Sequence, residues 1–294
     1  MNRIIEYIID TANDGKSSEV FLRELGYSSK LMSCIKKTEN GIMVNNHFQY
    51  ASCPLHEGDI LRVLITENES STFIPYEYKL DIIYEDEDIL VVNKPADMPV
   101  HPSMGNYEFT LGNAVANYYK NETSSFVFRC INRLDRDTSG LTIIAKNPLS
   151  ALFLSNMQIK REIKRTYHAV VEGIIKDAGT VDAPIARAGN SIIERCVDYN
   201  TGEFAVTHYT PISYHNDTTL LELKLETGRT HQIRVHMNYI GHPLLGDFLY
   251  NPGANNLIKR QALHSYSLEF NHPVSGHSMK LICSYPDDIK SIIL

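Results

Sequence analysis

Nine residues bring two carboxylates, two guanidinium groups and a Thr-Ser-Gly turn into one short segment, RLDRDTSGL at 133–141. The apolar run TIIA follows directly, which indicates a loop that enters a strand. Asp135 stands between Arg133 and Arg136, and a nearby cation favours the charged form of a carboxylate. A charged carboxylate can serve as a nucleophile or as a general base. Turn chemistry does not decide between Asp135 and Asp137, and a surface turn with ion pairs is the competing interpretation.

A second polar segment, KLETGRTHQIRVH at 224–236, joins the end of a predicted strand to the start of a predicted helix. Arg229 lies near the N-terminus of that helix, where free amides and the helix dipole also favour anions. Arg234 follows further along. His231 and His236 are five residues apart, a spacing that fits neither a metal pair at i and i+4 of a helix nor one face of a strand. We therefore predict no metal site here.

Tyr167 follows a basic run, KREIKR at 160–165, at the head of the predicted strand KRTYHAVVEG. An aromatic ring at this position can be an ordinary core residue, or it can stack on a base as aromatic residues do in RNA sites. Lys164 and Arg165 are candidates to contact a phosphate backbone, although a basic run of this kind is often a solvated face.

The overall charge argues against a nucleic-acid binder unless basic residues gather locally. Lys and Arg total 28 against 35 Asp and Glu, so the formal net charge is −7. Affinity for phosphates comes largely from basic residues, so RNA binding requires that they collect on one face. We expect such a basic face around Asp135, with acidic residues over the rest of the surface.

The sequence lacks the motifs of several common binding sites, and it also lacks the signals for secretion or membrane insertion. GxGxxG after a strand, GxxxxGK[ST] and GxSxG are absent, so neither a nucleotide cofactor nor a serine nucleophile is predicted. The apolar runs are strand-sized and the N-terminus has no secretion signal, so no membrane span is expected. No CxxC pair occurs among the scattered cysteines, which argues against zinc knuckles and disulfides and fits a cytoplasmic protein. The cysteines are Cys34, Cys53, Cys130, Cys196 and Cys283.

Composition divides the chain into a small domain at 1–65, a polar linker at 66–76 and a large domain at 77–294. The sequence of the small domain predicts a helix that ends at Gly26 and a second helix capped by Ser28 or Ser29. It also predicts strands at GIMVNN and ILRVLI. This order resembles the S-four type RNA-binding module. The basic residues of its second helix are Lys30, Lys36 and Lys37.

The large domain contains many strand-like segments and two strong helix patterns. One helix begins at Pro148, a residue suited to the first turn, and runs towards Ile163. The other starts near Thr230 and is stopped by Gly241. Because strands and helices do not alternate strictly, we predict an α+β fold around a mixed, mainly antiparallel sheet.

Taken in order, five segments resemble an RluA-type pseudouridine synthase over about residues 77–275. They are VVNKPADMPVHPS, NRLDRDTSGLTIIAKN, KRTYHAVVEG, TGRTHQIRVHMNYIGHPLLGD and QALHSYSLEFNHP. Each match alone is modest, whereas five in the right order are specific. The chain departs from the family's usual residues at Asn132, where His is usual, at Ala96, where Gly is common, and at Glu203, where Lys is common.

The resemblance implies roles for particular residues and favours Asp135 over Asp137. The family's essential carboxylate aligns with Asp135, and its active-site tyrosine and arginine align with Tyr167 and Arg229. Arg229 would hold Asp135 charged and oriented, and Tyr167 would stack on the uracil. Further residues expected to bind RNA are Arg133, Arg136, Lys164, Arg165, Arg234 and Lys94.

The implied activity is an isomerase reaction that converts specific uridines to pseudouridine without a cofactor or a metal ion. Ribosomal RNA is the expected partner, transfer RNA is the second candidate, and a monomer is the expected state. A catalytically silent RNA-binding or ribosome-assembly factor on the same fold is the main alternative. A metal-dependent hydrolase is the third, and the scattered histidines argue against it.

Overall fold

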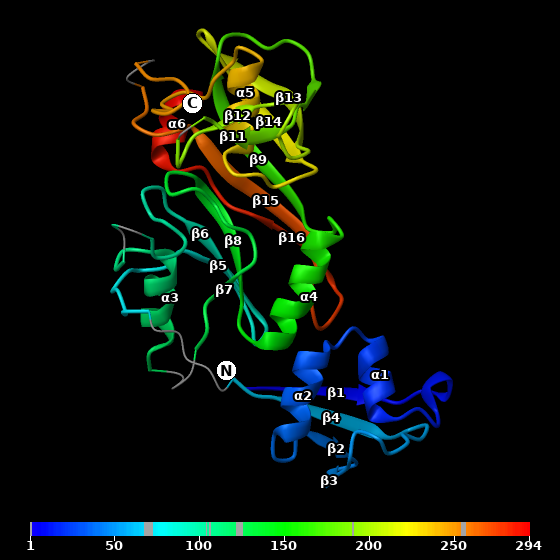
Figure 1. Ribbon diagram of the computed structural model, residues 1–294. Coiled ribbons are helices and arrows are strands. Elements are labelled where there is room, and N and C mark those ends of the chain that lie inside the picture. The colour runs from blue at the N-terminus through cyan, green and yellow to red at the C-terminus, as the bar shows by residue number, and fades with distance from the viewer. Residues whose placement is uncertain are drawn as a thin grey trace.

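The computed structural model of the 294-residue chain describes residues 2–67, 73–103, 105, 107–121, 126–189, 191–253 and 257–294. It contains a four-stranded sheet near the N-terminus and a ten-stranded sheet that spans most of the remaining chain. Figure 1 shows the N-terminal elements as a separate body beside the first turns of α4, with the large sheet extending away from them. Residues 68–72 of the predicted linker at 66–76 lie outside the described residues.

The N-terminal body packs two helices on one face of its sheet. Its elements are β1 (Arg3–Ile8), η1 (Thr11–Asn13), α1 (Ser18–Glu24), α2 (Ser29–Lys37), β2 (Ile42–Val44), β3 (His47–Phe48) and β4 (Ile60–Ile65), with the strand order β1-β4-β2-β3. Gly26 has a φ of +97°, a left-handed conformation that ends the first helix at little cost for glycine. The Ser28 hydroxyl accepts a hydrogen bond from the Leu31 amide, so this serine is the N-cap of α2.

Strand β1 is an element that the sequence did not predict. It pairs antiparallel with β4, with Ile5 opposite Val63 in the core. Ile4 and Ile8 lie on the outer face and are more than half exposed. Because apolar residues occupy both faces, the strand lacks the alternation that would reveal it.

The large sheet has the strand order β10-β13-β14-β9-β15-β8-β6-β5, with β16 beside β15 and β7 beside β8. The strands are β5 (Ile82–Glu85), β6 (Ile89–Lys94), β7 (Arg129–Cys130), β8 (Ser139–Ala145), β9 (Lys164–Glu172), β10 (Gly179–Asp182), β13 (Val206–His215), β14 (Thr218–Leu225), β15 (Leu263–Asn271) and β16 (Ser278–Ile282). Strands β11 (Ile185–Arg187) and β12 (Arg195–Val197) form a separate antiparallel hairpin. Within the described strands of the large sheet only β8 and β15 pair in parallel, which agrees with the predicted mixed, mainly antiparallel sheet.

The parallel contact between β8 and β15 depends on a glycine. Gly140 has a φ of +114°, and a Cβ atom built on it would lie 2.3 Å from the carbonyl oxygen of Ser265. Only glycine allows this backbone conformation and this approach together. The RLDRDTSGL loop therefore enters the sheet where β8 meets β15.

Among the described residues, four helices pack around the sheet: α3 (Leu111–Tyr119), α4 (Pro148–Ile159), α5 (Gln232–Tyr239) and α6 (Asp287–Ile293). The predicted helix at Pro148 ends before Ile163, because the chain turns at Arg161, whose φ is +59°. Helix α5 buries Ile233 and Met237 against β9 and β14, as its apolar spacing predicted. None of the helices described combines the length and apolar composition that crossing a membrane requires.

Helix α4 connects the two bodies. Leu149 is fully buried in the core of the N-terminal body, although it belongs to the chain of the large one. Phe153 lies edge-on to Tyr27, with ring centroids 6.0 Å apart. Arg3 of β1 adds two hydrogen bonds of 3.1 Å to the buried carboxylate of Asp88. The two bodies therefore share both apolar and ionic contacts.

Candidate active site

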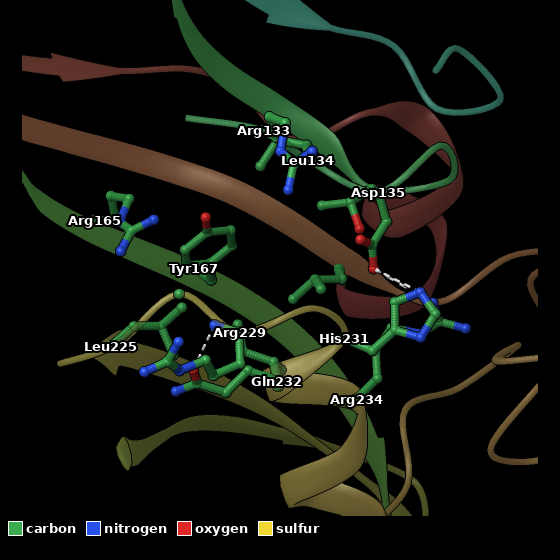
Figure 2. Close-up of a pocket in the computed structure, with 14 residues that line it drawn as sticks. Arg133, Leu134, Asp135, Arg165, Tyr167, Leu225, Arg229, His231, Gln232 and Arg234 are labelled. Atoms are coloured by element: carbon green, nitrogen blue, oxygen red, sulfur yellow. Dashed lines mark hydrogen bonds and ion pairs between the residues drawn. The ribbon is translucent and has the colours of Figure 1, made fainter. Parts of the chain in front are cut away.

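A pocket lies where the RLDRDTSGL loop, strand β9 and the start of α5 meet (Figure 2). It is lined by Arg133, Leu134, Asp135, Thr138, Arg165, Tyr167, Leu225, Gly228, Arg229, His231, Gln232, Ile233, Arg234 and Leu263. The segments that contribute to it lie far apart in the chain, from Arg133 to Leu263. The structure thus brings Asp135, Tyr167 and Arg229 to one cavity, although they do not contact one another as expected.

The cation that pairs with Asp135 is Arg234. Its Nη1 atom lies 3.3 Å from Oδ2 of Asp135. The same guanidinium binds Asp247 through Nε and Nη2 at 2.7 and 2.8 Å, so its orientation is fixed. Arg234 is only 3% exposed. Arg234 also lines the pocket, so its predicted part in RNA binding stays a prediction, although its charge is used between two carboxylates inside the protein.

Arg229 does not form the ion pair with Asp135 that the sequence predicted. Its Nη1 atom pairs with the carboxylate of Glu203, and its Nε atom donates to the carbonyl of Phe204 at 3.1 Å. The Arg229 backbone amide also binds the side chain of Gln232, a contact drawn in Figure 2. Arg229 precedes α5 and its side chain is 40% exposed, whereas Arg234 lies within the helix and is buried. A ligand at the rim of the pocket could still reach Arg229.

The two aspartates of the loop have different environments. Asp137 is 8% exposed, and its carboxylate accepts two hydrogen bonds of 3.1 Å from Arg136. Its carbonyl accepts a third from Arg260. Asp135 instead opens into the pocket, with a side chain 29% exposed. The geometry therefore leaves Asp135 available for chemistry and gives Asp137 a structural role.

Tyr167 lies on β9 with its side chain in the pocket, next to Arg165 (Figure 2). The residue is 5% exposed. Burial raises the pKa of the Tyr167 hydroxyl, and the nearby Arg165 guanidinium opposes that increase. The phenol therefore stays protonated at neutral pH and offers an aromatic ring and a hydroxyl group to whatever enters.

His231 is a pocket residue that the sequence considered only as a metal ligand. Its Nε2 atom lies 3.8 Å from Oδ2 of Asp135, and its Nδ1 atom lies 2.9 Å from the hydroxyl of Tyr250. That hydroxyl already accepts the backbone N–H of Arg195, so its own proton can point to Nδ1 of His231. Burial lowers the pKa of His231; Asp135 opposes that decrease and Arg234 adds to it, so that the pKa lies below its ordinary value. Neutral His231 then carries its proton on Nε2, the atom that faces Asp135.

The remaining residues that were predicted to bind RNA fall into two groups, those that line the pocket and those that are exposed outside it. Arg133 and Arg165 line the pocket. Arg136 is exposed but is engaged by Asp137 and, at 3.6 Å, by Asp97. Lys164 is exposed and donates to the carbonyl of Arg161. Because side chains alternate along β9, Lys164 faces away from the side that carries Arg165 and Tyr167.

Lys94 does not reach solvent, so the prediction that it binds RNA is wrong. It is 0% exposed, and its ammonium donates to the carbonyls of Pro95, Met98 and Arg136 at 2.7, 2.8 and 3.0 Å. Burial lowers the pKa of Lys94 to about 7. Three carbonyl acceptors nevertheless match the three protons of an ammonium group. Lys94 thus braces the loop that carries Asp135.

The pocket lining is positively charged despite the acidic total. Four arginines line it, against Asp135 as the carboxylate among the lining residues. Three of them lie close to the position that a ligand would take beside Tyr167, namely Arg133, Arg165 and Arg229. This arrangement fits the predicted basic face around Asp135.

A group that could hold a cation lies elsewhere, at the start of β6. Among the residues described, Asp86, Asp88 and His272 place ligand atoms within 4.8 Å of one another. Asp88 already accepts hydrogen bonds from Arg3, Asn147 and Ser150, and Asp86 lies 2.8 Å from His272. These residues therefore form a polar junction within the protein, and none of them lines the Asp135 pocket.

Comparison with known proteins gives consistent matches. A family model described as RNA pseudouridylate synthase matches residues 88–239. The chain is 41% identical over 272 residues to an uncharacterized RNA pseudouridine synthase, YjbO of Bacillus subtilis, covering 92% of this chain and 95% of that protein. It is 41% identical over 239 residues to the ribosomal large subunit pseudouridine synthase D of Escherichia coli K12, covering 76% and 73%. The solved structure of human RNA Pseudouridylate Synthase Domain Containing 1 aligns with a TM-score of 0.60 and 26% identity, over 71% of this chain and 84% of that one.

Proposed function

The chain belongs to the RNA pseudouridylate synthase family, and we propose that it isomerises uridines of large-subunit ribosomal RNA in the Asp135 pocket. The enzyme class, an isomerase acting on RNA, follows from the family. The choice of ribosomal RNA is supported by 41% identity to a protein named as a ribosomal large subunit pseudouridine synthase. Transfer RNA is the alternative substrate.

The reaction requires little beyond correctly placed polar groups. The bond from ribose C1′ to uracil N1 breaks, the base turns, and C1′ bonds to C5. The proton on C5 is lost and N1 gains one, so the product is an isomer of the substrate and no electrons are exchanged. A carboxylate such as Asp135 can act as a nucleophile or as a base in this sequence. The target base must first leave its stack, at a cost of a few kcal/mol.

The other groups of the pocket have roles that follow from their positions. Arg234 compensates the charge of Asp135 and is itself held by Asp247. Tyr167 offers its ring to the uracil, since base–aromatic stacking contributes about 1–3 kcal/mol. His231 presents Nε2–H on the side of Asp135 and so could exchange a proton with the turning base.

One observation carries the proposal: Asp135 opens into a pocket with Arg234 and Tyr167, while Asp137 two residues later is occupied by Arg136. The corresponding test is Asp135→Ala, assayed for pseudouridine formation and for RNA binding. We expect isomerisation to disappear while binding survives. Asp177→Asn, an exposed aspartate outside the pocket, is the matched control and should behave as the unchanged protein. Residual isomerisation in Asp135→Ala would refute the assignment, and an inactive unchanged protein would favour the catalytically silent alternative.

The substrate can be identified directly. Pseudouridine maps of total RNA from cells with and without the gene should differ at positions in large-subunit ribosomal RNA. If only transfer RNA positions are lost, the substrate assignment is wrong while the isomerase activity stands.

We further propose that residues 1–65 form an RNA-binding module of the S-four type and that the protein acts in the cytoplasm as a monomer. Lys30, Lys36 and Lys37 are exposed on α2 and support RNA contact by the module. Lys36 is paired with Glu19, so it contributes less free charge than the other two.

A further inference from the structure

We propose that a cleft beside the Asp135 pocket binds a phosphodiester group of the RNA next to the target uridine, through Arg187, Arg195 and Arg229. This inference rests on the proposed function, since it assigns part of the same RNA to a second site. The cleft is lined by Ile185, Ala186, Arg187, Arg195, Thr201, Glu203, Gly228, Arg229 and Thr230.

The cleft and the pocket adjoin, because Gly228 and Arg229 line both. The cleft has a volume of about 470 Å³, against about 80 Å³ for the pocket. A flipped uridine stays covalently joined to its neighbours, so their phosphates must lie close to the mouth of the pocket. The larger, open space beside Arg229 can take that backbone.

The positive charges on the β11–β12 hairpin favour the binding of an anion. Arg187 and Arg195 are directly opposite each other in its antiparallel register. Like charges at such positions are destabilising. Arg195 donates to the carbonyls of Ile193 and Glu194, which leaves its charge unneutralised. Within the part of the chain that the structure describes, the exposed Arg187 has neither an ion pair nor a hydrogen bond from its side chain. A phosphate between the two arginines would neutralise positive charges that no carboxylate of the described residues pairs with.

The hairpin is held in place relative to the catalytic residues. Ile185 is buried in one apolar cluster with Val235 of α5 and with Tyr250, which follows that helix in the chain. The Arg195 backbone N–H also donates to the Tyr250 hydroxyl, which contacts His231. The two arginines are therefore presented from a fixed position beside the pocket, as a site that orients a substrate requires.

Glu203 is the carboxylate among the lining residues of the cleft, and it competes with a phosphate for Arg229. Its side chain is 68% exposed and that of Arg229 is 40% exposed. Ion pairs this exposed contribute only about 0–1 kcal/mol, so a phosphate could displace the carboxylate at small cost. Removing the Glu203 charge should accordingly strengthen RNA binding.

The test measures tritium release on RNA prepared from gene-deleted cells grown with [5-³H]uridine, since every target uridine in that RNA is unmodified. For the double variant Arg187→Gln and Arg195→Gln we expect KM to rise about tenfold or more, with kcat within about twofold. The slope of log KM against log salt should become shallower by about one for each arginine removed. Glu203→Gln should lower KM.

The double variant Lys224→Gln and Lys280→Gln is the charge-matched control, because these lysines pair with Glu222 and Glu269 and lie outside both cavities. If the arginine double variant changes KM and the salt slope no more than this control, the cleft does not bind the backbone. A fall in kcat at unchanged KM would also overturn the inference, because it would indicate a structural effect on the pocket. Absence of tritium release by the unchanged protein would instead refute the proposed function.

Discussion

Charge neutralisation around Asp135 depends on one buried arginine. Arg234 lies between Asp135 and the fully buried Asp247, so a single guanidinium serves two carboxylates. Arg229, five residues earlier, faces the rim of the same pocket and pairs with an exposed glutamate. We therefore expect the two arginines of TGRTHQIR to have different functions, with Arg234 holding Asp135 and Arg229 meeting the substrate.

Exchanging each arginine for glutamine should separate these functions. Arg234→Gln removes the partner of Asp135 and leaves the buried Asp247 without its cation, so we expect kcat to fall at least about 100-fold. Loss of a buried ion pair's partner also costs about 3–5 kcal/mol of stability. Arg229→Gln should mainly raise KM, because its side chain is exposed at the rim. Steady-state kinetics and urea unfolding of both variants provide the measurement. Equal losses of kcat would contradict the assignment.

How far the sequence predicts the site can be judged from these same residues. The ordered motifs predicted that Asp135 and Tyr167 lie together, and the structure places both in one pocket, because a loop and a strand position are local features. They could not decide which arginine turns inward, since this depends on how α5 rotates against the sheet. The helix phase did contain a signal: Arg234 follows the buried Ile233 and precedes the buried Met237, and an arginine at that position needs a carboxylate such as Asp247.

Lys94 shows a second limit of sequence patterns. It ends β6, whose other residues are almost all buried because both faces of this strand are covered. A lysine in such a strand looks like a surface residue, since charged groups are rarely buried without partners. The partners of Lys94 are three backbone carbonyls, and backbone partners of this kind cannot be predicted from a sequence pattern.

Strand β8 is fixed against β15 by Gly140, and this contact can be tested by adding one methyl group. Gly140→Ala would place a Cβ atom 2.3 Å from the Ser265 carbonyl oxygen, in addition to the strain of its φ of +114°. We expect a loss of about 3 kcal/mol or more in the free energy of unfolding, as for overpacked or strained core sites. Urea unfolding is the measurement. Gly276→Ala is the control, because its φ is also positive but nothing lies within 4 Å of the added atom; it should lose only about 1 kcal/mol. Similar losses at both positions would show that backbone strain, and not the strand contact, matters.

The opposite face of β9 and β15 carries histidines that are buried in the neutral state. His264 contacts the Ser139 hydroxyl and the Cys283 thiol, and His168 stacks on Tyr266. Burial lowers the pKa of both histidines to about 4. Between pH 6.5 and 4 the unfolded chain therefore binds protons that the folded chain does not, so stability is complete above pH 6.5 and falls as the pH drops towards 4.

Each histidine should contribute up to about 3 kcal/mol to this acid sensitivity, which corresponds to a shift of roughly 2.5 pH units. Urea unfolding at pH 4.5, 5.5 and 7 should show the decline. His264→Gln should reduce its steepness, even if that variant is less stable at pH 7. An unchanged pH dependence in His264→Gln would contradict the assignment to this histidine.

An acidic protein that acts on RNA must concentrate its basic groups. The net charge of −7 lowers non-specific attraction to nucleic acid, since that attraction depends on basic residues. The arginines of the Asp135 pocket and of the neighbouring cleft come from four separate segments, around residues 133, 165, 187–195 and 229–234. Folding thus creates a local positive surface that the composition conceals, and the acidic remainder should favour the proper substrate over other RNA.

The N-terminal body is coupled to the large body through an ion pair between Arg3 and the buried Asp88, and this coupling can be tested with one substitution. Arg3 makes two hydrogen bonds of 3.1 Å to Asp88, whose side chain is 4% exposed. Arg3→Gln should leave that carboxylate undercompensated and cost about 3 kcal/mol. We expect calorimetry to resolve separate unfolding transitions for the two bodies in this variant, with the N-terminal body unfolding first. Arg62→Gln is the matched control, because Arg62 pairs with Glu6 on the exposed face of the same small sheet and should change stability by less than about 1 kcal/mol. If Arg3→Gln and Arg62→Gln unfold alike, the ion pair between Arg3 and Asp88 does not couple the two bodies.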